Sequence, residues 1–258
     1  MKILELEKIR IGVVNYLNTR PMVYGIERSE YIQQNAICTG DFPANVARGL
    51  ISGKFDMGLV PVAVIPKLPQ YYIVSDYCIG ADGEVASVGV FSECPLEELE
   101  EIYLDYQSRT SITLAQILFK NHWKKQVSFI PAEENFIENI KGKRGAVIIG
   151  DRALRQLNIS SYYYDLALAW RDYTGLPFVF AAWISTRKVS QEFTDEFNKA
   201  NALGFQHLDE IVAKEDFSAY PLKEYYTKNV SYHLDERKKA ALSRFLQEIE
   251  EFEGLLTQ

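Results

Sequence analysis

The sequence predicts a two-lobed α/β protein. Short apolar runs alternate with segments of helical periodicity over most of the 258 residues, a pattern typical of βαβ units and a doubly wound sheet with parallel strands. The length allows two lobes of roughly 100–150 residues each. From residue 190 to 252 the pattern becomes mostly helical, with charged and apolar residues interleaved. The simplest layout is therefore two α/β lobes and a helical tail.

The first part of the chain is predicted to contain both strands and helices. Pro21 and Pro43 each follow a turn-rich stretch and suit the first turn of a helix, and Gly53 suits the end of the second helix. Apolar runs around them predict buried strands. The predicted elements are a strand over 9–14, helices over 21–26 and 43–50, and strands over 56–60 and 85–91.

A second alternating series follows, and the tail ends in an amphipathic helix. Apolar residues three or four positions apart in the tail form one stripe that faces a core, namely Leu242, Phe245, Leu246 and Ile249. The series consists of strands over 102–105, 127–130, 146–149 and 178–184, and helices over 111–123, 132–141, 151–157 and 166–173.

Two crossings of the chain between lobes are expected, near 92–95 and near 185–188. They give a first lobe of residues 1–92 plus 186–258 and a second lobe of residues 93–185. No Gly/Ser-rich or Pro-rich linker separates these parts, so the lobes are expected to share a tight cleft. In such sheets ligands bind beyond the carboxyl ends of strands, near helix N-termini.

Composition argues against several classes of protein. The net charge of -7 and the lack of a basic stripe argue against nucleic-acid binding, and no run of ~18 apolar residues predicts a membrane span. Three scattered cysteines and a charged N-terminal stretch predict a cytoplasmic protein with reduced thiols. No P-loop, dinucleotide-binding or nucleophile-elbow motif occurs, and the three histidines stand apart, so no cofactor or metal is expected.

Four loops at predicted strand ends carry polar residues, at 15–18, 78–87, 105–111 and 150–152. The third leads into a helix, where hydroxyls and backbone N–H groups converge on a positive helix end that suits a carboxylate. Each loop also has a structural interpretation: Ser108, Thr110 or Ser111 caps this helix, Asp151 caps its own helix, and the glycines of the second loop serve a turn. Together the loops predict a cleft for a small anionic molecule.

The segment Asn15-Tyr16-Leu17-Asn18-Thr19-Arg20-Pro21 resembles the opening of the chorismate dehydratases of the futalosine route to menaquinone, where a Tyr-Leu-Asn-x-x-Pro segment follows the first strand. The similarity continues in order over nearly the whole chain, which makes it specific. It includes the segments 53–61, 83–87, 104–105, 108–111, 149–154, 165–166, Trp170, 174–183 and 225–232.

This resemblance implies a type-2 periplasmic-binding-protein-like fold with a ligand cleft between the lobes. It implies loss of water from chorismate to give 3-[(1-carboxyvinyl)oxy]benzoate, with no metal or organic cofactor. Asn18 and Ser87 match family positions close to the reacting substrate and are the expected catalytic residues. The expected substrate-binding residues are Tyr16, Ser108, Arg109, Thr110, Ser111, Asp151, Thr174 and Gly175.

The proton acceptor has two candidates. A proton must leave C3 of chorismate and hydroxide must leave C4, and no histidine matches a family motif. The substrate's own enolpyruvyl carboxylate can take the proton, with Asn18 orienting that group or stabilising charge on the ring. Asp151 is the carboxylate that competes for this role.

Two other functions share the expected fold. The sister enzyme of the same pathway, 1,4-dihydroxy-6-naphthoate synthase, carries a Cys-Pro-Asn-Asp-Thr-type first loop and a cleft histidine, and neither occurs here. A solute-binding protein or a ligand-sensing domain has the same architecture, but this sequence shows no export signal and no DNA-binding helix-turn-helix. The expected partner is a small anionic substrate. The oligomeric state stays open, with a homodimer as one option.

Overall fold

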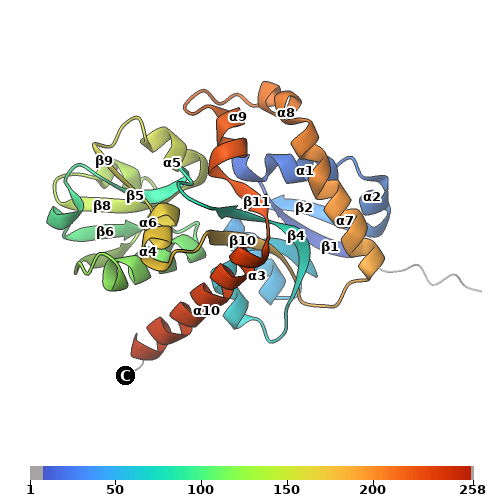
Figure 1. Ribbon diagram of the computed structural model, residues 1–258, viewed down its shortest axis with the longest axis horizontal. Coiled ribbons are helices and arrows are strands. Elements are labelled where there is room, and N and C mark those ends of the chain that lie inside the picture. The colour runs from blue at the N-terminus through green and yellow to red at the C-terminus, as the bar shows by residue number, and fades with distance from the viewer. Residues whose placement is uncertain (1–7, 257–258) are drawn as a thin grey trace, which may run out of the picture.

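The computed structural model describes residues 8–256, which form two lobes, each built on one β-sheet (Figure 1). The larger sheet contains β1 (Ile9–Val14), β2 (Ala36–Asp41), β3 (Met57–Pro61), β4 (Tyr72–Ala81), β10 (Phe178–Ser185) and β11 (Ser231–His233), in the order β11-β4-β10-β3-β1-β2. The smaller sheet contains β5 (Val88–Ser92), β6 (Glu101–Leu104), β7 (Ser128–Pro131), β8 (Arg144–Ile149) and β9 (Tyr162–Asp165), in the order β7-β6-β8-β5-β9.

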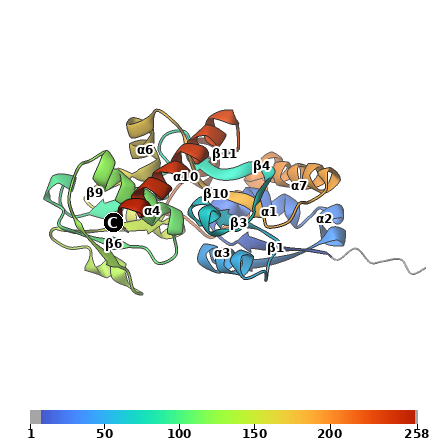
Figure 2. The same cartoon turned by 90° about the horizontal axis from the view of Figure 1, so that it is seen from below.

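Helices cover both sheets. The lobe of the larger sheet carries α1 (Arg20–Ile26), α2 (Glu30–Asn35), α3 (Pro43–Ile51), α7 (Gln191–Leu203), α8 (Leu208–Lys214) and α9 (Leu222–Glu224), and the other lobe carries α4 (Arg109–Asn121), α5 (Gly150–Gln156) and α6 (Leu166–Thr174). The last helix, α10 (Glu236–Leu256), contacts β10 of one lobe and α4 of the other (Figure 2). Short helical turns are η1 (Leu17–Thr19), η2 (Val62–Lys67), η3 (Leu96–Glu98), η4 (Phe136–Asn139), η5 (Gly204–Gln206) and the π-helical η6 (Tyr225–Asn229).

The two-lobed α/β architecture is confirmed, but neither sheet is wholly parallel. In the larger sheet β1 pairs in parallel with β2 and β3, whereas β10 runs antiparallel to β3 and β4. In the smaller sheet β6 pairs in parallel with β7 and β8, whereas β5 runs antiparallel to β8 and β9. Strand β11 also runs antiparallel to its neighbour β4. Of the reversed strands, β5 and β10 are those by which the chain enters each sheet from the other lobe.

Both crossings lie earlier in the chain than expected. The structure places β5, expected in the first lobe, in the smaller sheet, and β10, expected in the second lobe, in the larger sheet. The chain therefore crosses at residues 82–87 and 175–177. All five residues of β5 are buried, and seven of the eight in β10. An apolar run of this kind predicts a central strand without indicating which sheet it joins.

One predicted helix is wrong. The segment 132–141 contains only the short turn η4, and Asn135 just before it adopts a left-handed backbone with φ of 64°. A left-handed residue cannot continue a right-handed helix, so the helical spacing of apolar residues here reflects a turn that buries Phe136. The strands β2, β4, β9 and β11 were not among the predicted elements.

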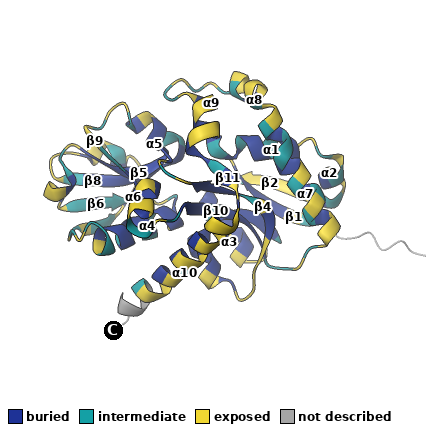
Figure 3. Cartoon of the chain, viewed as in Figure 1, coloured by how far each residue is buried: buried dark blue, intermediate teal, exposed yellow. Residues whose placement is uncertain are grey.

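The two lobes share a hydrophobic core (Figure 3). Trp170 of α6, Phe178 of β10 and Phe245 of α10 meet edge-to-face, with ring centroids 4.9 to 5.8 Å apart. The buried carboxylate of Glu248 on α10 accepts hydrogen bonds from Arg244, from Tyr173 of α6 and from Asn121 of α4. The predicted apolar stripe of α10 is confirmed, because it packs against both lobes. Within residues 8–256 no helix is long and apolar enough to cross a bilayer.

Replacing Gly25 with alanine is expected to lower the free energy of unfolding by about 2 kcal/mol, as overpacking in a tight contact does. A Cβ atom at Gly25 of α1 would lie 1.8 Å from the carbonyl oxygen of Ala200 in α7, so the helix backbones must separate. The matched control is Gly40→Ala, because nothing lies within 4 Å of a Cβ there. Chemical denaturation measures both, and equal stability of the two variants would contradict the expectation.

Candidate functional site

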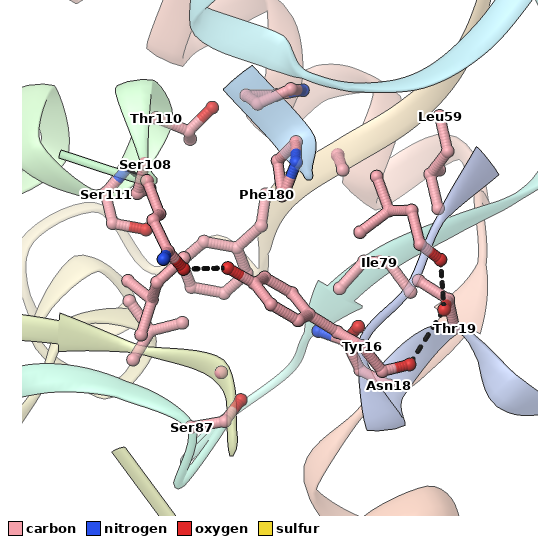
Figure 4. Close-up of a pocket in the computed structure, with 18 of the residues that line it drawn as sticks. Tyr16, Asn18, Thr19, Leu59, Ile79, Ser87, Ser108, Thr110, Ser111 and Phe180 are labelled. Carbon is pink, nitrogen blue, oxygen red and sulfur yellow. Dashed lines mark hydrogen bonds between the residues drawn. The ribbon is translucent and has the colours of Figure 1, made fainter. Parts of the chain in front are cut away.

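A pocket lies at the boundary of the lobes, where loops from both sheets meet (Figure 4). It encloses about 580 Å³ of empty space, including the solvent at its open mouth. The larger-sheet lobe contributes Val14, Tyr16, Asn18, Thr19, Pro43, Leu59, Pro61, Ile79, Phe180 and Ala181. The first crossing and the smaller-sheet lobe contribute Val85, Ser87, Val88, Gln107, Ser108, Thr110, Ser111, Ile149 and Gly150.

The loop after β1 places Tyr16, Asn18 and Thr19 on the pocket wall. The hydroxyl of Thr19 closes this turn, lying 2.7 Å from the carbonyl oxygen of Val14 and 2.8 Å from that of Tyr16. The Tyr16 hydroxyl donates to Oε1 of Gln107 on the other lobe at 2.5 Å, and burial raises the pKa of Tyr16, so this phenol stays protonated. The buried Oδ1 atom of Asn18 has no hydrogen-bond partner within the described part of the chain, so it can accept a hydrogen bond from a ligand.

Helix α4 begins at the pocket wall and presents hydroxyls there. Ser108 is its N-cap residue, and its Oγ accepts from the backbone N–H of Ser111 at 3.1 Å. The Oγ1 atom of Thr110 accepts from the backbone N–H of Ala63 in the other lobe, also at 3.1 Å. Each of these oxygens already accepts a hydrogen bond from the protein, so the one proton of each hydroxyl is available for donation. The positive end of the 13-residue helix adds to this preference for an anion.

Ser87 lies in a tightly held turn at the first crossing. Ala86 adopts a left-handed backbone with φ of 62°, a strained conformation that persists only where the surroundings hold it. Oδ2 of Asp165 accepts from the N–H groups of Val85 and Ala86, both at 2.8 Å. The carbonyl of Ser87 accepts from the N–H of Gly150 at 2.8 Å. The backbone that carries Ser87 is therefore held in place by both Asp165 and Gly150.

The carboxylate of Asp165 joins this turn to α6. Its Oδ1 accepts from the N–H groups of Ala167 and Leu168, and its Oδ2 also accepts from the Tyr163 hydroxyl at 2.6 Å. Burial raises the pKa of Asp165 to about 6, while these hydrogen bonds favour the charged form. Asp165 is thus the N-cap of α6 and the support of the Ser87 turn at once.

No Lys, Arg, Asp or Glu among the described residues lines the pocket. Arg152 of α5 is paired with the fully buried Asp105 at the start of the 105–111 loop, its Nη2 lying 2.9 and 2.7 Å from the two carboxylate oxygens. Nor do three His, Cys, Asp or Glu side chains in residues 8–256 gather closely enough to hold a metal ion. An anionic ligand would therefore be held by hydroxyls and backbone N–H groups rather than by a cation.

A sequence profile of the family described as menaquinone biosynthesis matches residues 9–251, nearly the whole chain. The chain belongs to the menaquinone biosynthesis family. A chorismate dehydratase of Thermus thermophilus is 24% identical to this family member over 264 residues, which cover 92% of this chain and 93% of the relative. A chorismate dehydratase of Campylobacter jejuni is 32% identical over 121 residues, covering 45% of this chain and 54% of the relative.

Solved structures confirm the periplasmic-binding-protein-like fold of this menaquinone biosynthesis family member. A crystal structure of an Archaeoglobus fulgidus protein matches with a TM-score of 0.74 at 16% identity, covering 96% of this chain and 98% of that one. The periplasmic aliphatic sulphonate binding protein of Escherichia coli matches with a TM-score of 0.62 at 12% identity, covering 96% and 93%. At these identities the likeness shows the fold alone.

Six of the ten expected site residues of this family member line the pocket together, namely Tyr16, Asn18, Ser87, Ser108, Thr110 and Ser111. Four do not. Arg109 is exposed in the first turn of α4, with its side chain outside the pocket wall. Thr174 and Gly175 end α6, where Thr174 donates to the carbonyl of Trp170 and Gly175 takes the left-handed C-cap conformation.

Asp151 lies behind the first loop, and its expected role as cap of its own helix is wrong. The N-cap of α5 is Ile149, whereas Oδ1 of Asp151 accepts from the backbone N–H of Leu17 at 3.2 Å. Asp151 therefore supports η1 in the opposite lobe, a contact between residues 134 positions apart that local sequence cannot reveal.

Sequence reasoning missed several contributors to the site, among them Gln107, Gly150 and Tyr225. Gln107 and Gly150 lie within loops that were singled out, and both line the pocket. Tyr225 lies outside every such loop, yet its hydroxyl donates to Ser87 Oγ at 2.7 Å. The signal in the sequence that pointed to Tyr225 was its place in the segment 225–232, which resembles the family.

Proposed function

We propose that this protein is a chorismate dehydratase, a lyase that removes water from chorismate to give 3-[(1-carboxyvinyl)oxy]benzoate for menaquinone biosynthesis. Membership of the family and the names of both relatives support this function. The observation that carries this function is the polar lining of the pocket: the hydroxyls of Ser87, Ser108 and Thr110, which already accept hydrogen bonds from the protein, lie on a wall without charged side chains. Such a wall suits a small dianion with an unsaturated ring. We also place the enzyme in the cytoplasm, in keeping with its three unpaired cysteines.

The two carboxylates and the leaving group of chorismate find complementary groups. The N-terminus of α4, with Ser108, Thr110 and Ser111, would bind one carboxylate. The dianion of chorismate has a single hydrogen-bond donor, the hydroxyl at C4, and the unpartnered Oδ1 of Asn18 can accept from it. The Ser87 hydroxyl would donate to the same oxygen as negative charge develops on it.

The proton at C3 is best assigned to the substrate's own enolpyruvyl carboxylate. No carboxylate among the described residues lines the pocket, and Asp151 directs its Oδ1 toward the backbone N–H of Leu17. The C3–H pair then forms the C3–C4 double bond, and the C4–O pair leaves with the oxygen. The acquired proton converts the leaving hydroxide to water, and aromatisation drives the reaction.

Incubating the purified, chelator-treated protein with chorismate tests this function. We expect enzyme-dependent loss of one water per chorismate, followed by mass and by aromatic absorbance, and unchanged turnover after metal removal. Saturable binding without turnover would overturn the dehydratase assignment and indicate a solute-binding or sensing protein. If chorismate does not bind at all, a cyclic futalosine derivative is the next substrate to test, because the sister enzyme acts on it.

A further inference from the structure

Tyr225 lies directly behind Ser87, on the side away from the pocket. It belongs to η6, is fully buried, and donates its hydroxyl hydrogen to Ser87 Oγ at 2.7 Å across 138 positions of the chain. Tyr225 itself does not line the pocket. In Figure 4 the Ser87 hydroxyl points toward the pocket interior, on the wall opposite Thr110 and Ser111. Tyr225, which lies outside the pocket wall, therefore supports a hydroxyl that faces the pocket.

The turn that carries Tyr225 is π-helical, a rare conformation that is frequent at functional sites. Its wide ring is closed by the N–H of Val230, which donates to the carbonyl of Tyr225 at 3.0 Å. The same turn holds the Ser87 turn a second time, because Nδ2 of Asn229 donates to the carbonyl of Glu84 at 3.3 Å. The π-helical turn is thus hydrogen-bonded to the Ser87 turn at two points, the Ser87 side chain and the backbone carbonyl of Glu84.

The direction of the hydrogen bond decides what Ser87 can do. Burial raises the pKa of Tyr225, so the phenol stays protonated at any physiological pH. The phenol is a stronger acid than an aliphatic hydroxyl, and it therefore takes the donor role. Ser87 Oγ then accepts from behind, and its own single hydrogen is directed away from Tyr225, toward the pocket or toward Asn18, which also lies beside the phenol.

We propose that Tyr225 is a positioning residue, which fixes Ser87 as a hydrogen-bond donor to the oxygen leaving C4 of the substrate. This inference rests on the proposed dehydratase function and deepens it. As the C4–O bond breaks, its electron pair moves to oxygen, and the Ser87 hydrogen bond strengthens with that charge. Neither side chain gains or loses a proton overall, because the water formed takes its second hydrogen from C3.

The test is a double-mutant cycle of Tyr225→Phe and Ser87→Ala, assayed for chorismate dehydration. Tyr225→Phe keeps the ring and is expected to lower kcat about tenfold, the equivalent of one hydrogen bond, while KM and the melting temperature change little. In the Ser87→Ala background the same substitution is expected to have no further effect. The matched control is Tyr232→Phe, because Tyr232 is also a buried tyrosine and its hydroxyl has no hydrogen-bond partner within the described residues. Its kcat is expected to equal that of the wild type.

Three outcomes overturn the inference while leaving the dehydratase function intact, provided that the wild type turns chorismate over. These are a wild-type kcat for Tyr225→Phe, an equal tenfold loss from Tyr225→Phe with and without Ser87, and a wild-type kcat for Ser87→Ala. A wild type that neither dehydrates nor binds chorismate overturns the function and the inference together. If the wild type binds chorismate without turnover, the same double-mutant cycle is measured on the dissociation constant of chorismate. Additive effects of the two substitutions on that constant would overturn the role of Tyr225.

Discussion

Replacing Asn18 with alanine is expected to lower kcat/KM for chorismate about 100-fold, the scale of loss that misplacing a reacting group produces. The Oδ1 atom of Asn18 is buried on the pocket wall and has no hydrogen-bond partner among residues 8–256. The C4 hydroxyl of chorismate is the one donor that the substrate can offer. Without this acceptor the leaving group can rotate away from the Ser87 hydroxyl. Steady-state kinetics measures the loss, which should appear in kcat as well as in KM.

The control for this prediction is Asn139→Ala. Asn139 is exposed in η4 and does not line the pocket, so its variant should match the wild type. The fold should survive the Asn18 substitution, because η1 is held by Thr19 and Asp151 rather than by the Asn18 side chain. Turnover of Asn18→Ala within threefold of the wild type would contradict the assigned role.

Replacing Asp165 with asparagine is expected to lower the melting temperature by about 10 °C, which corresponds to roughly 3 kcal/mol of stability in a chain of this length. Asp165 accepts five hydrogen bonds, from the N–H groups of 85, 86, 167 and 168 and from the Tyr163 hydroxyl. An asparagine must turn its NH₂ toward at least two of these donors and leaves them without an acceptor. Because the Ser87 turn loses its support, kcat should fall as well.

Asp172→Asn is the matched control, because Asp172 is exposed on the same helix. A Tm of Asp165→Asn within about 2 °C of this control would contradict the structural role.

The pH dependence of stability provides a second measurement of the role of Asp165. The folded state raises the pKa of Asp165 to about 6, above its ordinary value of 3.8, so the folded protein binds this proton more tightly than the unfolded chain does. The part of the stability that comes from this tighter proton binding is therefore complete below pH 3.8 and is lost as the pH rises through 6. The variant should lack this part of the pH dependence.

Local sequence predicted most elements because each is determined by neighbours in the chain. The strand expected over 9–14 is β1, and the helix expected over 166–173 is α6, which is capped by Asp165 at its start and by Gly175 at its end. The loops at 15–18, 78–87 and 105–111 each supply part of the pocket wall, because strand ends are where polar groups can face a ligand. The helix expected over 132–141 failed at Asn135, whose left-handed backbone no spacing of apolar residues indicates.

The sequence by itself determined the α/β class, the family and six of the residues that line the pocket, since periodicity, capping and motif order are local properties. The tertiary structure alone decided which sheet β5 and β10 join, that Asp151 supports the opposite lobe, and that Tyr225 stands behind Ser87. The roles of Asp151 and Tyr225 depend on contacts between residues more than 80 positions apart. The placement of β5 and β10 depends on which of two sheets an apolar strand joins. Burial and hydrogen-bond pairing make that choice only when the whole chain is packed.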